Sequence, residues 1–401
     1  MYYKNLTTIL FFISYVFLVL SSPVNLENNV VNNTRKSIEI KATEDMQSVA
    51  DNLKITEIKG DYGLDLVLKN GGFDNDNELF KFISNYMGYN VTNAYVNTNG
   101  MGCSTFQTPN EKGDGYYFVR NLDFYKSDTL IMITRPDNGY SSISTINTHH
   151  ITMISQNVSP DEWKDLLFNH PEEDLISVPE DIKRILSIYI PVDGVNEKGL
   201  SISVNMVPLG SRPYDPNKPN LTTGLAVRTM LDKAATVDEA VNILQGSNLF
   251  PSLSFDVHFL IADASGASVT VEYVNNKINV IKTKIITNFY IANGFERNIE
   301  ADPKDEEGHD RYEIIDSMMK KYPNMNYEQI TDTLKQVRGV TKWSVVYDQS
   351  NLLATYYLNK NYDVEYHIKL FDEDDKEDSA IEVSVDEFTE NQESDSDDET
   401  Y

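Results

Sequence analysis

Two short stretches decide how the centre of this chain folds: MGCSTF at residues 101–106 and VRNLDF at residues 119–124. Between them, residues 110–115 have the sequence NEKGDG, which is rich in turn-forming residues. A hairpin folded at this turn pairs the two stretches in antiparallel fashion. We expect Cys103 to lie opposite Leu122 in that hairpin.

The same pairing brings a sulfur, a guanidinium and a carboxylate together, because Arg120, Asn121 and Asp123 become neighbours of Cys103. Cys103 is the only cysteine of the chain and therefore forms no internal disulfide. A buried thiol beside a structural Arg–Asp pair is one interpretation. A catalytic group is the other, and the clustering of reactive side chains favours it.

A cysteine nucleophile needs a base, and none of the six histidines stands in a recognisable signature around Cys103. His258 alternates within a predicted strand and is interpreted as a packed core histidine. The other candidate base is the α-amine of the nucleophile's own residue, whose reference pKa is about 7.7 to 8. This choice requires Cys103 to be the first residue of a mature chain, so it predicts cleavage between Gly102 and Cys103.

Both ends of the chain have compositions that are not typical of a folded domain. Lys4, the apolar residues 6–20 and the following serines predict a signal peptide over residues 1–21, and hence a secreted or endomembrane-lumenal protein. Residues 372–401 hold fifteen acidic residues and one lysine, half of the formal charge of −28, and predict a disordered, solubilising tail. A calcium- or partner-binding tail stays open as an alternative.

The charge also excludes partners, because so acidic a chain repels nucleic acid and anionic membrane surfaces. No stretch after the signal is long and apolar enough to span a membrane. Four sequons after the predicted signal peptide suit a glycosylated secreted chain: Asn32, Asn90, Asn157 and Asn220.

Strands and helices occur in blocks rather than in βαβ alternation, which predicts an α+β fold with antiparallel sheets covered by helices. Residues 24–51 are polar and lack apolar periodicity, so we expect an exposed segment there. Residues 76–87 have helical spacing behind a cap at Asp76. Residues 200–206 alternate, which predicts a half-buried strand with Asn205 on its polar face.

Further motifs follow the hairpin in order. They are NEKGL at 196–200 with Asn205, HFLIAD at 258–263 through Glu272, Thr287-Asn288, Arg311-Tyr312 and WSVVY at 343–347. With the hairpin, this series resembles the choloylglycine hydrolase and penicillin V acylase family of linear amide hydrolases, from about Gly60 to Phe371. The Cys-plus-RNLD part alone is also similar to acid ceramidase-like amidases.

The resemblance implies a four-layer αββα sandwich of two antiparallel sheets, the N-terminal nucleophile (Ntn) hydrolase fold, over residues 103–371. Residues 22–102 would be the leader of a precursor, separated from the catalytic domain by the cleavage before Cys103; whether it then leaves or stays associated is open. The implied reaction is hydrolysis of a small-molecule, nonpeptide N-acyl amide through a thioester, with no metal and no organic cofactor. The resemblance leaves a homo-oligomer open.

The resemblance also implies roles at the hairpin. Cys103 would attack the amide carbon through sulfur while its freed amine moves protons. Arg120 and Asp123 would orient that amine and thiol. A buried ion pair between Arg120 and Asp123 is the structural alternative.

Three later residues complete the implied site. Asn205 and Asn288 would lie around the oxyanion, where each donor is worth roughly 3 kcal/mol in acyl transfer. Arg311 would stabilise charge that develops near the nucleophile. As structural alternatives, the asparagines would cap turns and Arg311 would pair within its own helix.

Two segments differ from the bile-salt members of the family, namely Phe289-Tyr290 and Gly308-His309-Asp310. In the family these segments line the substrate side, so bile-salt conjugates are not the expected substrates. Two other functions stay open. One is an acyltransferase that uses the same chemistry, and the other is a secreted binding protein that has lost the reaction.

Overall fold

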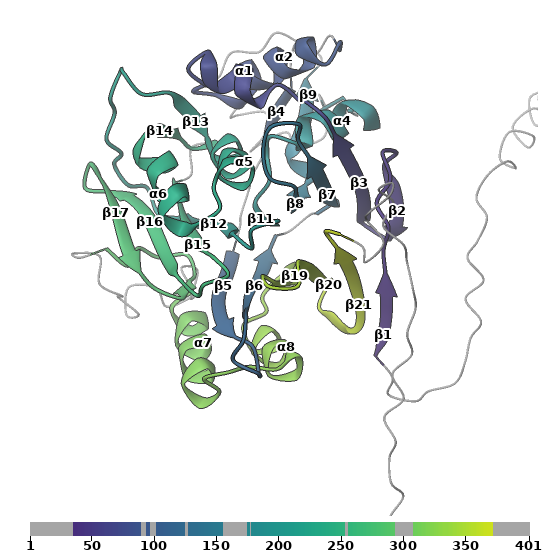
Figure 1. Ribbon diagram of the computed structural model, residues 1–401, viewed down its shortest axis with the longest axis vertical. Coiled ribbons are helices and arrows are strands. Elements are labelled where there is room, and N and C mark those ends of the chain that lie inside the picture. The colour runs from purple at the N-terminus through teal and green to yellow at the C-terminus, as the bar shows by residue number, and fades with distance from the viewer. Residues whose placement is uncertain are drawn as a thin grey trace, which may run out of the picture. The chain divides into compact units, whose positions relative to one another are not determined.

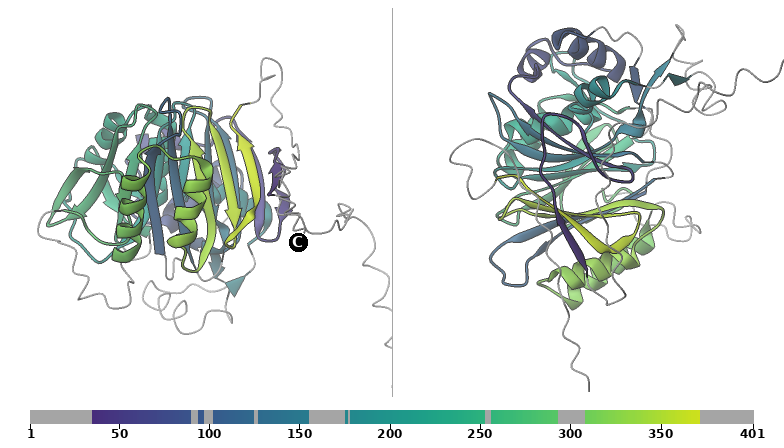
Figure 2. Two further views of the ribbon diagram at one scale, coloured as in Figure 1. Left: turned by 90° about the horizontal axis from the view of Figure 1, so that it is seen from below. Right: turned by 90° about the vertical axis from the view of Figure 1, so that its right-hand side faces the viewer.

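Two large β-sheets lie face to face, with helices on the outer side of each (Figures 1 and 2). The computed structural model describes residues 35–89, 94–96, 102–124, 127–154, 175–176, 178–252, 256–292 and 308–371. All of these belong to one unit, Arg35–Phe388. The predicted signal peptide and acidic tail lie outside the described residues.

Sheet A has seven strands and carries the hairpin. Its order is β1 (Lys36–Glu39), β21 (Asn361–Lys369), β20 (Leu353–Leu358), β19 (Thr341–Asp348), β6 (Tyr116–Asp123), β5 (Gly102–Pro109) and β18 (Ile285–Ile286).

Sheet B has nine strands. Its order is β17 (Lys277–Lys282), β16 (Ser268–Val274), β15 (Asp256–Ala262), β12 (Ser201–Val207), β11 (Asp193–Asn196), β8 (Ser142–Asn147), β7 (Thr129–Arg135), β3 (Leu53–Lys59) and β2 (Gln47–Ala50). Two small sheets accompany it: β10 (Leu175–Ile176), β9 (Ile151–Ile154) and β4 (Ala94–Val96) in one, and β13 (Asn220–Thr222) with β14 (Asn248–Phe250) in the other.

Helices cover both outer faces. The face of sheet A packs against α7 (His309–Lys321) and α8 (Tyr327–Gln336). The cluster outside sheet B holds α1 (Leu64–Lys69), α2 (Asp76–Tyr86), α4 (Glu180–Ser187), α5 (Thr223–Lys233) and α6 (Val237–Gln245). A short 3-10 helix, η1 (Thr148–His150), follows β8. None of the described helices is long and apolar enough to cross a membrane.

The apolar core divides into layers that match this arrangement. One cluster fills the space between the sheets and includes Cys103, Ile131 and Trp343. The other two large clusters join sheet B to its helices and sheet A to α7 and α8. The predicted α+β fold with four αββα layers is therefore confirmed.

The expectation of purely antiparallel sheets is wrong at two places. β1 pairs with β21, and β3 with β7, in parallel. Both added strands come from residues before the hairpin, and each reaches its neighbour through a long connection rather than a tight turn, which permits the parallel direction.

The expectation of an exposed segment at residues 24–51 is wrong for its described part. Residues 36–39 and 47–50 form β1 and β2, and the neighbouring Ile40 and Ala42 are buried. Further along the leader, β3 lies inside sheet B, between β7 and β2. Residues 36–86 are therefore built into the sandwich.

Two local expectations also need correction. The cap of α2 is Asn75, whose side chain accepts a hydrogen bond from the Glu78 amide, and not Asp76. Strand β12 is buried on both faces rather than one. Its apolar face meets the helices, and its polar face, with Ser203 and Asn205, meets polar side chains of sheet A, so neither face needs water.

Candidate active site

The hairpin forms with the expected register. β5 and β6 pair so that Cys103 lies opposite Leu122 and Gly102 lies opposite Asp123. Side chains alternate along a strand, so the Cys103 thiol points between the two sheets. Cys103 is fully buried.

Three polar atoms of Cys103 each contact a predicted site residue. Its amide N–H donates to Asn288 Oδ1 at 2.9 Å. Its carbonyl oxygen accepts from Arg311 Nη1 at 2.7 Å. Its sulfur lies 3.3 Å from Arg120 Nη2. Residues from β5, β6, the segment after β18 and α7 thus meet at one cysteine.

Arg120 is held by sheet B and not by the partner that the sequence suggested. Its guanidinium donates to the carbonyl oxygens of Val192 and, at 2.6 Å, of Val204. The buried carboxylate that pairs with it is Asp193, with Nη1 and Oδ2 3.3 Å apart. The proposed Arg120–Asp123 pair is therefore replaced by an Arg120–Asp193 pair.

Asp193 is a site residue that the sequence analysis missed. It is fully buried and also accepts a hydrogen bond from the Tyr347 hydroxyl at 2.6 Å. An aspartate between apolar Val192 and Val195 was the available signal, because a charged side chain in a buried strand needs a partner. Its carboxylate balances the charge of the Arg120 guanidinium and helps to hold that group beside the thiol.

Asp123 lies on the opposite face of the hairpin from the thiol, beside Gly102. A Cβ on residue 102 would stand 3.2 Å from the Cβ of Asp123, so glycine leaves room for this carboxyl. Burial raises the pKa of Asp123, opposed by the hydrogen bond from Thr341. A carboxyl next to the Gly102–Cys103 bond therefore favours its protonated form more than an exposed aspartate does.

Asn288 occupies the place where sheet A would continue. β18 pairs Ile286 with Thr105, and the same register carried forward puts Asn288 opposite Cys103. There the side-chain amide takes over from the backbone: Oδ1 accepts from Cys103, and Nδ2 donates to the Met206 carbonyl at 2.9 Å. Asn288 therefore lies at the cysteine, while its donor group, expected around the oxyanion, is bound to Met206 in this conformation.

Asn205, also expected around the oxyanion, contacts neighbours of Cys103 and Asn288. Its Oδ1 accepts from the Thr105 hydroxyl at 3.1 Å, and its Nδ2 donates to the Thr287 carbonyl at 2.9 Å. These contacts tie β12 to β5 and to the segment that carries Asn288. In this conformation Asn205 positions neighbours of the nucleophile.

Arg311 reaches the cysteine from the first turn of α7. Besides the Cys103 carbonyl, it donates to Ser104 Oγ and to Asn288 Oδ1, both at 3.0 Å. The helix is preceded by Gly308, whose φ of 79° is left-handed, and a Cβ there would lie 2.4 Å from Arg311 Nη2. Glycine at this position lets the guanidinium fold back toward β5.

The thiol is not activated in the uncleaved chain. Burial raises the pKa of Cys103, and the nearby charge of Arg120 opposes that effect only in part. A protonated thiol is a weak nucleophile. An added base, such as a free α-amine on the same residue, would supply what the uncleaved chain lacks.

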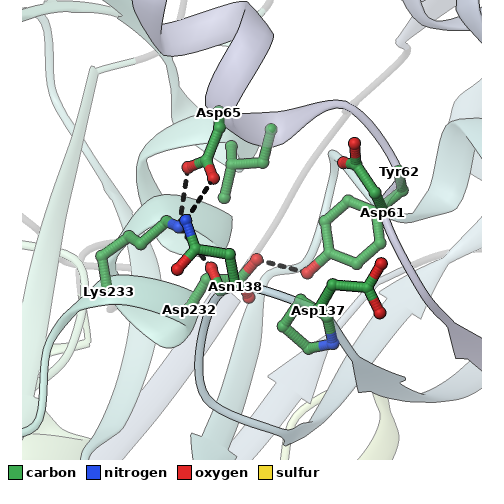
Figure 3. A pocket seen from close by; sticks show the side chains of 9 residues that line it. Asp61, Tyr62, Asp65, Asp137, Asn138, Asp232 and Lys233 are labelled. Carbon is green, nitrogen blue, oxygen red and sulfur yellow. Dashed lines mark hydrogen bonds and ion pairs between the residues drawn. The ribbon is translucent and has the colours of Figure 1, made fainter.

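Figure 3 shows a cavity of about 160 Å³ that lies away from this site. Its lining includes Tyr62 and Leu64, which belong to the apolar cluster outside sheet B, whereas Cys103 belongs to the cluster between the sheets. Sheet B therefore separates the cavity from the cysteine. The geometry assigns the cavity no part in chemistry at Cys103.

Part of this chain is similar to known proteins. Residues 103–290 match the family model described as linear amide C–N hydrolases, choloylglycine hydrolase family, and the match begins at the cysteine itself. A penicillin V acylase from Pectobacterium atrosepticum is 33% identical over 96 residues, which are 21% of this chain and 26% of that enzyme. The aligned part thus spans about a quarter of that relative.

Solved structures with a related arrangement include a conjugated bile acid hydrolase from Clostridium perfringens, at 17% identity, a TM-score of 0.45, and coverage of 72% of this chain and 97% of that one. A penicillin V acylase from Agrobacterium tumefaciens has 18% identity, a TM-score of 0.40, and coverage of 64% and 83%. The family match and the sequence relative point to one group: residues 103–290 of this chain are similar to the choloylglycine hydrolase family of linear amide C–N hydrolases.

Proposed function

We propose that this chain is a secreted N-acyl amide hydrolase whose nucleophile is Cys103, freed as an N-terminal residue by cleavage of the Gly102–Cys103 bond. One observation carries the proposal. The nitrogen, oxygen and sulfur of Cys103 contact Asn288, Arg311 and Arg120, so the site is built around the polar atoms of one residue.

The proposed reaction has two steps. The Cys103 sulfur attacks the amide carbon and its proton passes to the free α-amine, which then protonates the departing amine as the C–N bond breaks. The thioester that remains is attacked by water, whose proton returns through the α-amine, and the carboxylic acid and thiol are released. Arg120 faces the sulfur throughout, and Asn288 holds the amine.

Activation follows the same chemistry on the chain itself. The Cys103 sulfur attacks the Gly102 carbonyl carbon, the proton moves to the Cys103 nitrogen, and the peptide bond becomes a thioester that water cleaves. This yields a Gly102 carboxylate, a free thiol and a free α-amine. Asp123, which lies opposite Gly102, is suited to carry a proton to the departing nitrogen.

Secretion is part of the proposal, and the sequence of residues 1–22 supports it. Of the four sequons, Asn220 lies within the described residues. Its side-chain oxygen accepts a hydrogen bond from Asn248 at 3.0 Å, and a glycan, which is attached at the side-chain nitrogen, leaves this oxygen unmodified. If the host glycosylates the protein, we expect modification at these sequons: Asn32, Asn90, Asn157 and Asn220.

The proposal is tested on purified protein by N-terminal sequencing and turnover. We expect mature protein that begins at Cys103 and hydrolyses at least one of a panel of acylated amino acids, fatty amides, penicillin V and bile conjugates. Cys103→Ala should stay uncleaved and inactive, whereas Cys103→Ser keeps a weaker nucleophile and should retain slow cleavage. Active protein with an intact Gly102–Cys103 bond would overturn the mechanism.

The same preparation separates the two alternatives. Hydroxylamine should intercept the thioester and give a hydroxamate. If added amines outcompete water as acceptors, the chain is an acyltransferase. If no thioester is trapped, and Cys103→Ala binds ligand as the wild type does, the chain is a binding protein.

A further inference from the structure

A second buried pair of polar side chains lies between the sheets, close to the site. His258 on β15 and Glu272 on β16 lie directly opposite each other in the sheet, with Nδ1 and Oε1 3.0 Å apart. Both side chains are fully buried. The sequence analysis interpreted His258 as a packed core residue, and its burial agrees, but an apolar contact does not describe its surroundings.

The hydrogen bonds of this pair reach the backbone of one segment. His258 Nε2 is 3.0 Å from the Thr287 carbonyl oxygen, which can only accept, so this nitrogen donates. Glu272 accepts from the amides of Ile291, at 2.9 and 3.1 Å, and Ala292, at 2.8 Å. Both side chains therefore contact the backbone of residues 287–292.

This pair holds both ends of the segment that carries Asn288. His258 fixes the Thr287 carbonyl, which also accepts from Asn205, and Glu272 fixes the amides of Ile291 and Ala292. Between these anchors, the Asn288 side chain reaches the Cys103 amide. The segment from 287 to 292 has little regular structure of its own, since β18 ends at Ile286.

We propose that His258 and Glu272 are positioning residues that hold Asn288 against the nitrogen of Cys103. This positioning role rests on the proposed function. In the contacts described above, His258 and Glu272 touch the segment that carries Asn288 and not Cys103 itself. Buried ion pairs contribute little net stability, so the retention of one beside the nucleophile is better explained by the specific geometry that it imposes.

The test is Glu272→Gln. Glutamine replaces one of the two acceptor oxygens with an NH2 group, so a contact to His258 or to the Ile291 and Ala292 amides weakens, the segment should shift and Asn288 should leave Cys103. A displacement of about 1 Å lowers turnover by up to about 100-fold, and we expect kcat to fall while KM changes less than about threefold. His258→Gln keeps one donor for Thr287 and should lose less activity, which supplies a second variant if the first folds poorly.

A control exists in sheet A. His367 and Glu365 lie two residues apart on β21, with Nε2 and Oε2 3.4 Å apart, and are partly exposed. Glu365 is bound to Arg35 and Tyr357 rather than to the segment that carries Asn288. Glu365→Gln should therefore leave kcat unchanged. Full kcat in Glu272→Gln, or an equal loss in Glu365→Gln, would overturn the proposal.

One readout does not depend on activity. A crystal structure of Glu272→Gln should show Asn288 displaced from Cys103, and an unmoved Asn288 would refute the positioning role. A wild type without amidase activity would instead refute the proposed function, while this readout still decides the placement of Asn288.

Discussion

Cleavage at Gly102–Cys103 should not release the leader. Ten large apolar side chains before the cleavage point are 4% exposed or less and lie in clusters shared with later residues: Ile40, Leu53, Ile55, Ile58, Tyr62, Leu64, Val67, Leu79, Phe80 and Ile83. Burial of such a side chain contributes at least about 1.5 kcal/mol, so exposing all ten would cost on the order of 15 kcal/mol. This equals or exceeds the whole stability of an ordinary domain.

Polar contacts add to this attachment. At the cavity in Figure 3, Asp65 pairs with Lys233 at 2.7 Å and accepts from Asn138 at 2.6 Å, and the Tyr62 hydroxyl donates to Asp232. β3 also pairs along its full length with β7. Losing the leader would therefore open sheet B, so dissociation and unfolding should be one event.

The assay is size exclusion of matured protein under native conditions, followed by a denaturing gel. We expect two fragments that elute together in buffer and in high salt and separate only in denaturant. Phe80→Ala should destabilise the cleaved protein by about 3–5 kcal/mol, whereas Leu66→Ala, at a position 38% exposed, should change it by less than about 1 kcal/mol. A folded, active fragment that starts at Cys103 and lacks the leader would refute this reasoning.

Three further outcomes are expected. Asp123→Asn should lower turnover at least about 100-fold. It should also raise Tm at neutral pH, because burial raises the pKa of Asp123 and the stability of the wild type falls as pH rises through that pKa. This gain in Tm should vanish below about pH 4, and a lower Tm at pH 7 would contradict the prediction. Gly308→Ala and Gly60→Ala should each lower the free energy of unfolding by about 1–2 kcal/mol, since both glycines have a left-handed φ. Only Gly308→Ala should displace Arg311 and lower kcat. Equal kcat values for the two variants would contradict this placement of Arg311. In the uncleaved chain, the rate of Cys103 alkylation should be low at pH 7 and should rise about tenfold per pH unit, because burial raises the pKa of the Cys103 thiol. An alkylation rate that does not change between pH 7 and 9 would contradict this.

Local patterns predicted the hairpin well. A single turn at residues 110–115 fixes the register of β5 and β6, so the position of Cys103 opposite Leu122 could be worked out from residue counting. The contacts of Asn288 and Arg311 required the resemblance, since both residues are far from Cys103 along the chain.

What the sequence could not give depends on distant partners. β1 pairs with residues 364–367, and such pairing leaves no periodicity in a short, polar strand. Strand β12 has an ordinary alternating pattern, but its polar face turns inward because Thr105 of the other sheet meets Ser203 there. The partner of Arg120 was misassigned for the same reason, since Asp193 becomes its neighbour only when sheet B packs on sheet A.

β18 stops after two residues, and this early end has a chemical consequence. If β18 continued by backbone pairing, the Cys103 nitrogen would donate to a main-chain carbonyl of that strand, as in any regular sheet. The side-chain amide of Asn288 accepts this hydrogen bond instead. A side-chain amide can rotate when cleavage converts the Cys103 peptide nitrogen into an amine with a lone pair. The new N-terminus at Cys103 would thus stay bound to Asn288 and could still accept and donate protons.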